Sequence, residues 1–194
     1  GVFMAMQGKP AALAYVDGLN FTEPLFVFAI MVVAASRAVL QISRQLVAFN
    51  ARLLPLPPAT AYFLVVMSLV PLLGSFITEP AAMTLAALIL RDGFYAQPIS
   101  NRLKYATLGV LFVNISIGGV MTPYAAPPVL MVAGTWGWDI GFMMTHFGWR
   151  AAIAVLFNAA MLTFLFRHEL RALPAVAEDQ SRPRVPAALQ CWHL

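Results

Sequence analysis

One acidic side chain draws attention because of its surroundings. Glu79 is the single charged residue between Leu53 and Leu90, a stretch that is otherwise almost wholly apolar. A charge at the centre of a bilayer costs about 2.5–3.5 kcal/mol on insertion scales, so such residues usually serve a function. A carboxylate placed there can hold a proton and a cation in turn. The competing interpretation is that Glu79 lies in water at the tip of a turn and only caps a helix.

Neutral oxygen-bearing side chains occur near Glu79 and again in a second uncharged segment. Oxygen ligands suit hard cations, whereas small hydroxyl residues also allow membrane helices to pack closely without any function in binding. The candidate set for binding an ion or a proton is Glu79, Thr78, Ser75, Asn114, Ser116 and Thr122.

The composition indicates a membrane protein. Of the 194 residues, 61% are hydrophobic and 10% are charged, compared with roughly 45–50% and roughly 25% in soluble proteins. The mean hydropathy is +0.79. Too few charged side chains are present to cover a soluble globule of this size, which excludes a soluble enzyme with one core.

Enzyme, metal and nucleic-acid functions find no support. The single cysteine excludes a disulfide framework and a thiolate metal site, and the three histidines have no ligand spacing. No phosphate-binding glycine loop and no serine–histidine pairing occurs in the apolar runs. The net charge of +4 does not indicate a nucleic-acid surface, because the basic residues lie between apolar runs. We therefore expect no enzyme activity, no cofactor and no metal beyond a transported ion.

Four apolar stretches predict a polytopic helical bundle that crosses the membrane several times. A span needs about 20 residues, and the predicted segments, within a transmembrane unit at 21–170, are 22–44, 59–90, 105–136 and 150–168. Residues 1–20 are expected to be the end of a preceding segment and a loop. Residues 171–194 are rich in proline and charge, which predicts a disordered tail.

Two of these segments have lengths that indicate breaks. Residues 59–90 would make a helix of about 48 Å, too long for one span of about 30 Å and too short for two spans and a turn. Pro71, Gly74 and Pro80 predict a break near 74–79. A re-entrant hairpin or a broken helix satisfies both observations.

The second such segment is interrupted in the same manner. Irregular backbone at membrane depth survives only where it lines a cavity or is buried in protein, and broken helices of this kind form the binding sites of transporters. We expect an unwound stretch near 121–127, followed by a new half-helix that begins at the last proline. The interrupting residues are Gly118, Gly119, Pro123, Pro127 and Pro128.

The basic residues predict the orientation of the hairpin. If 59–90 enters and leaves on one face, ten basic residues lie on that face and only Lys9 and Arg150 lie on the other. Cytoplasmic loops carry an excess of lysine and arginine, so the hairpin is expected to open toward the cytoplasm. The loop expected at 134–149, rich in tryptophan, would lie at the outer interface.

The remaining charged residues have simpler interpretations. Arg37 either ends the first span by snorkelling or lies inside as the counter-charge of Glu79 or of an anionic substrate. Asp92, Asp139 and His146 are expected in loops, without a function.

Two segments resemble a known family. They are 74–84, GSFITEPAAMT, and 114–128, NISIGGVMTPYAAPP. They are similar to a bacterial family of Na+/H+ antiporters, within the ion transporter superfamily of NhaD-type antiporters, arsenite pumps and citrate or dicarboxylate carriers. The resemblance implies a re-entrant hairpin with Thr78 and Glu79 at its tip, facing an unwound loop. Many relatives have Asn-Thr or Asp-Asn where this chain has Thr-Glu.

The resemblance also implies a function and partners. It implies a secondary transporter that exchanges Na+ for protons, in the bacterial inner membrane. The chain would form about one of two inverted halves, with the lipid bilayer and the remaining half as partners; a homodimer is compatible with this. The alternatives are an organic-anion or oxyanion carrier that uses Arg37, and a membrane fragment that transports nothing.

Overall fold

The computed structural model describes residues 37–174 and, in the chain before them, residues 25, 28, 29 and 32. These described residues form helices and short connections, with no strand among them, which confirms the all-α prediction for this part of the chain. The long helices are α3 (Arg37–Arg52), α4 (Pro58–Ile77), α5 (Glu79–Leu90), α6 (Asn101–Gly118), α7 (Pro127–Trp136) and α9 (Trp149–Leu165). The short ones are η1 (Arg91–Tyr95), η2 (Gly119–Met121), α8 (Ile140–Met143), η3 (Met144–Gly148) and α10 (Arg167–Ala172).

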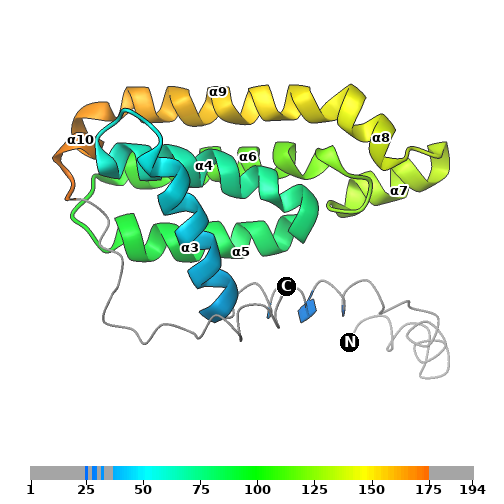
Figure 1. Cartoon of the computed structure of the whole chain (residues 1–194), viewed down its shortest axis with the longest axis horizontal. Coiled ribbons are helices and arrows are strands. Elements are labelled where there is room, and N and C mark those ends of the chain that lie inside the picture. Colours follow the sequence, from blue (N-terminus) through cyan, green and yellow to red (C-terminus); the bar gives the residue numbers. More distant parts are fainter. Residues whose placement is uncertain (1–24, 26–27, 30–31, 33–36, 175–194) are drawn as a thin grey trace, which may run out of the picture.

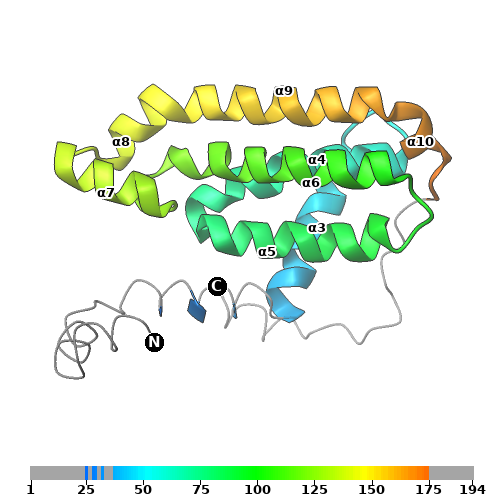
Figure 2. The same ribbon diagram turned by 180° about the vertical axis from the view of Figure 1, so that it is seen from behind.

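Three continuous helices are long and apolar enough to cross a membrane: Pro58–Ile77, Asn101–Met121 and Ile140–Leu165. Figures 1 and 2 show α4, α5, α6 and α9 running alongside one another, with α3 crossing them obliquely. Most of the predicted span 22–44 lies outside the described residues, and its last part belongs to α3, which continues to Arg52. Residues 1–20 and most of the predicted tail also lie outside.

Helices α4 and α5 form a hairpin with a single residue, Thr78, between them. The break lies inside the range 74–79 predicted from the sequence. Pro80 falls in the first turn of α5, where its missing N–H is not needed. Gly74 lies at a close approach of the two helices, because a Cβ on it would lie 3.1 Å from the Cβ of Ala82.

The second predicted break is also present. Helix α6 tightens into the 3₁₀ turn η2, residues 122–126 are not helical, and α7 begins at Pro127. Pro127 and Pro128 occupy its first turn, as expected from the lack of a backbone N–H in proline. Figure 2 shows α7 continuing beyond the end of α6 after the non-helical turn.

The prediction of a loop at 134–149 is wrong. Helix α7 extends to Trp136, Gly137 reverses the chain with a left-handed φ of 65°, and a helix restarts at Ile140. The restart is stabilised by the Asp139 carboxylate, which accepts the N–H of Phe142 at 2.7 Å. The third long helix therefore begins about ten residues before the predicted span, and His146 is an exposed helical residue rather than a loop residue.

Asp92 is also not in a loop. It lies in the π-helical turn η1 that extends α5, and its carboxylate pairs with Arg44 of α3 at 2.5 Å and with Arg91 at 2.7 Å. The hydrogen bond from Arg91, followed by the bond and charge of Arg44, lowers the pKa of Asp92, although partial burial opposes this. The pairing fastens α3 to the open end of the hairpin.

Helix α4 is the centre of the bundle. Helix α4 packs against α5, α6, α9 and α3. Its Phe63 ring contacts the ring of Phe94 edge-on, with ring centroids 5.1 Å apart. Its buried residues include Met67, Val70 and Ser75. Because α4 is enclosed on several sides, its last turn and the hairpin tip are held at a fixed place against the broken helix.

Candidate ion-binding site

The tip of the hairpin and the unwound stretch of the second broken helix face each other. The N–H of Glu79, the first residue of α5, donates to the carbonyl of Ala125 at 3.1 Å. The first N–H groups of a helix have no partner within the helix. The break in the α6–α7 segment therefore supplies the acceptor that the start of α5 needs.

Ser75 joins the ends of α4 and α6. Its hydroxyl donates to the carbonyl of Gly118 and accepts the N–H of Met121 at 3.1 Å, while its own carbonyl accepts the hydroxyl of Thr122 at 2.5 Å. The last carbonyls of a helix are unpaired within it. Ser75 and Thr122 satisfy them across the interface, and both residues are fully buried.

Glu79 is half-buried beside this junction. Its Oε1 accepts the hydroxyl of Ser116 at 2.9 Å, and a Cβ on Gly119 would lie 3.8 Å from its Oε2. Among the described residues, no basic side chain pairs with it. The carboxylate thus has one neutral hydrogen-bond donor and retains capacity to bind a proton or a cation.

Thr78, between the two hairpin helices, has the one left-handed φ of a non-glycine residue in the described part of the chain, 83° with ψ 149°. Such conformations cost about 1–3 kcal/mol and concentrate at functional sites. Its hydroxyl oxygen is buried and has no hydrogen-bond partner. An oxygen in that state is available as an additional ligand next to Glu79.

Asn114 lies at a different contact from the one expected. Pro71 has no N–H to donate to the carbonyl of Met67 one turn earlier in α4, and the Asn114 amide donates to that carbonyl at 2.9 Å. The same amide nitrogen reaches the carbonyl of Val155 at 3.3 Å, and its oxygen accepts from Asn158 at 3.1 Å. Asn114 therefore braces α4, α6 and α9, and the structure does not bring it against Glu79.

Sequence reasoning missed Asn158, although a signal was present. It is the only amide side chain in the uncharged run 151–166. A polar side chain inside such a run must find a partner, since an unpaired one is costly in lipid. What could not be found from the sequence was the partner, Asn114, on another helix.

Two of the other predicted residues, Pro123 and Gly118, lie at the junction. Pro123 is in the non-helical stretch, and Gly118 packs directly on the backbone of Pro71. Arg37 begins α3, but its side chain lies outside what the structure describes.

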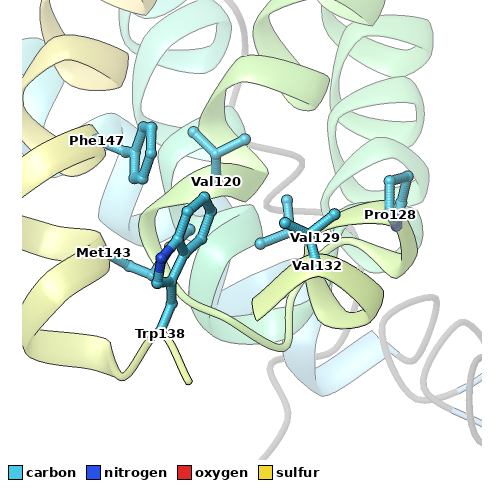
Figure 3. Close-up of a pocket in the computed structure, with 7 residues that line it drawn as sticks. All are labelled: Val120, Pro128, Val129, Val132, Trp138, Met143 and Phe147. Carbon is cyan, nitrogen blue, oxygen red and sulfur yellow. The ribbon is translucent and has the colours of Figure 1, made fainter. Parts of the chain in front are cut away.

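Two pockets that open to the surface adjoin the junction. One, of about 300 Å³, lies between α7 and the α8–η3 region and is lined by apolar side chains, among them Val120, Trp138 and Phe147 (Figure 3). The other, of about 460 Å³, is lined by Ser116 and Arg150 together with apolar residues. Within the described residues, no group of three or more histidine, cysteine or acidic side chains could hold a metal ion.

Comparison with known families decides the class of protein. The model of the family described as "Putative Na+/H+ antiporter" matches residues 1–194, the whole chain. The chain belongs to this antiporter family. No curated protein and no solved structure matches it. The family is one of transporters rather than enzymes, which agrees with the membrane-length helices of this chain.

Proposed function

We propose that this antiporter chain exchanges Na+ for protons through Glu79, which holds the two ions alternately. The observation that carries the proposal is the position of the Glu79 carboxylate. It lies at the junction of two broken helices, half-buried, with the neutral Ser116 hydroxyl as its hydrogen-bond donor. One negative charge balances one Na+ or one proton, so occupancy by either ion excludes the other.

Oxygen atoms and helix ends at the junction support binding of a hard cation. The unpartnered hydroxyl of Thr78 and the hydroxyl of Ser116 are neutral oxygen ligands next to the carboxylate. The C-terminal ends of α4 and α6 meet there, and each carries about half a negative charge. The N-terminus of α5 contributes the opposite sign, which stabilises the ionised carboxylate before Na+ arrives.

We infer that α4 and α5 form a re-entrant hairpin that opens toward the cytoplasm. The open end of the hairpin, the start of α6 and helix α10 lie at one end of the bundle (Figure 1). Basic residues gather in these segments and at the end of α3: Arg52, Arg91, Arg102, Lys104, Arg167 and Arg171. An excess of lysine and arginine is typical of the cytoplasmic side. The hairpin tip with Glu79 then lies within the membrane.

The order of a hairpin followed by a discontinuous helix also supports the wider assignment. We propose that residues 21–170 form one inverted-repeat half of a carrier of the ion transporter superfamily, embedded in a bacterial inner membrane. The second half, or a second copy in a homodimer, would close the other side of the junction. No observation in the described residues favours the organic-anion alternative, which depended on Arg37.

The test is transport by the complete protein in liposomes. A pH gradient is imposed, Na+ is added, and proton movement is followed with a pH-sensitive dye. Glu79→Gln is expected to abolish Na+-dependent proton movement, and Glu79→Asp to retain part of it. The control is Glu169→Gln, because Glu169 is the acid that accepts the N–H and hydroxyl of Ser100 at the basic end of the bundle. Unchanged exchange in Glu79→Gln would refute the proposal.

A further inference from the structure

Arg150 lies well within a membrane-length helix, although the sequence predicted that it flanks a span. The continuous helix Ile140–Leu165 has 26 residues, and Arg150 is ten residues from its start. Such a helix is about 39 Å long, about 9 Å more than the hydrocarbon thickness. Even if the whole excess projects beyond Ile140, the Arg150 backbone is about 6 Å inside the hydrocarbon. A cation at that depth is a candidate functional residue.

An open pocket on the surface lies between Arg150 and the junction of the broken helices, and the side chains of Arg150 and Ser116 are both exposed. Arg150 and Ser116 line the same space of about 460 Å³, and all the other side chains that line it are apolar. The hydroxyl of Ser116 in turn donates to the Glu79 carboxylate at 2.9 Å. The hydroxyl of Ser116 therefore lines the same pocket as Arg150 and also contacts the acid that we propose as the carrier.

The described residues leave Arg150 without an acidic partner. Its guanidinium lies 5.1 Å from the centre of the Trp149 ring, and no described carboxylate lies within salt-bridge distance. A cation–π contact of this kind is a weak substitute for an ion pair, and Arg150 is exposed on the protein surface, so its guanidinium is free to move. Glu79 is the acid linked to this pocket, because Ser116, which lines the pocket with Arg150, donates to its carboxylate.

We propose that Arg150 sets the Na+ affinity of the site by competing with Na+ for the Glu79 carboxylate. When the carboxylate has released its ion, the guanidinium turns toward it across the open pocket that Arg150 and Ser116 line. When Na+ binds, the guanidinium returns to Trp149. Arg150 is thus an affinity-determining residue and not an ion ligand. This inference rests on the proposed function, because it assumes that Glu79 holds Na+.

The expected effect is a lower Michaelis constant for Na+ once the charge is removed. Charges near a protein surface interact at an effective dielectric constant of about 20, and loss of a competing unit charge is expected to change the affinity for a cation about tenfold. Arg150→Gln is therefore expected to lower KM for Na+ about tenfold, with the maximal rate changed less than threefold. Arg150→Lys keeps the charge and is expected to keep KM within threefold of the parent.

Arg167→Gln is the matched control. Arg167 comes directly after the third long helix, within which Arg150 lies. Like Arg150 it stacks on an aromatic ring, that of Phe164 at 4.7 Å, but it lies at the basic end of the bundle. Its loss is expected to leave KM for Na+ unchanged. An equal fall of KM in both variants would mean that only the overall charge matters, and would overturn the proposal.

A variant whose charge is added after folding separates an effect on Na+ affinity from an effect on insertion of the protein into the membrane. Cys191 is first replaced by serine, and Arg150→Cys is then reacted in liposomes with a thiol reagent that adds either a trimethylammonium or a sulfonate group. The added cation is expected to raise KM for Na+ and the added anion to lower it. An unchanged KM in Arg150→Gln, or equal responses to both reagents, overturns the proposal while Glu79-dependent exchange persists. If the parent shows no exchange, the proposed function fails, and this inference with it.

Discussion

Gly118→Ala tests the contact that holds the two broken helices together. A Cβ on Gly118 would overlap the carbonyl oxygen of Pro71, lie 2.6 Å from its carbonyl carbon and lie 3.2 Å from the nitrogen of Leu72. These are backbone atoms of α4, which cannot rotate away as a flexible side chain could, so α4 and α6 must separate. The neighbouring bonds from Ser75 and Asn114 cross the same interface and would lengthen.

The expected loss of stability combines the cost of overpacking, the weakened hydrogen bonds and the gain in helix propensity. Overpacking costs about 1–3 kcal/mol, and two weakened hydrogen bonds add about 0.5–1.5 kcal/mol each. The better helix propensity of alanine returns at most about 1 kcal/mol. We expect Gly118→Ala to lower the free energy of unfolding by about 2–4 kcal/mol and to impair transport, since the junction with Ser75 and Thr122 is displaced.

The assay is thermal and denaturant unfolding of the purified protein in detergent, followed by circular dichroism. Gly109→Ala provides the control on the same helix, because a Cβ there meets nothing within 4 Å. It is expected to be neutral or stabilising by up to about 1 kcal/mol. Equal stability of the two variants would refute the close packing of α6 on Pro71.

Three further outcomes are expected. Thr78→Gly should raise the melting temperature, because it relieves about 1–3 kcal/mol of backbone strain, yet weaken Na+ binding through loss of the hydroxyl; melts with and without Na+ separate the two effects. Asn114→Leu should destabilise by about 2–4 kcal/mol, because it leaves the Met67 carbonyl and Asn158 without a partner, as denaturant titration would show. The parent should be more stable than Asp92→Asn at neutral pH, and this difference should disappear as the pH falls below 3.8, the ordinary pKa of the carboxyl group. The reason is that the pKa of Asp92 is lowered in the folded protein. Melting temperatures of both proteins across this pH range test the direction of the effect.

The breaks in the helices were predictable because proline and glycine act locally. Pro80 placed the start of α5 within two residues, and Pro127 and Pro128 placed the start of α7. Their fixed φ and missing N–H decide the backbone whatever surrounds them. The turn at Thr78 was harder to predict from the sequence. Threonine disfavours a left-handed φ, and the packed helices hold it in that conformation.

Contacts between distant helices were not predictable. The pairing of Asn114 with Asn158, and of Arg44 with Asp92, depends on how far one helix is shifted and rotated against another. The sequence showed the polar residues but not this register. The position of Arg150 within its helix was misjudged for a related reason. The helix was expected to begin near Arg150, whereas a carboxylate cap and aromatic stacking start it at Ile140.

The most direct test of the central claim is whether Na+ binding releases a proton from Glu79. Calorimetric titration of the complete protein with Na+ in two buffers of different ionisation enthalpy gives the number of protons released. We expect release of a proton from the parent protein, and neither Na+ binding nor proton release in Glu79→Gln. Proton release of the same size in Glu79→Gln would show that Glu79 is not the site at which the two ions exchange.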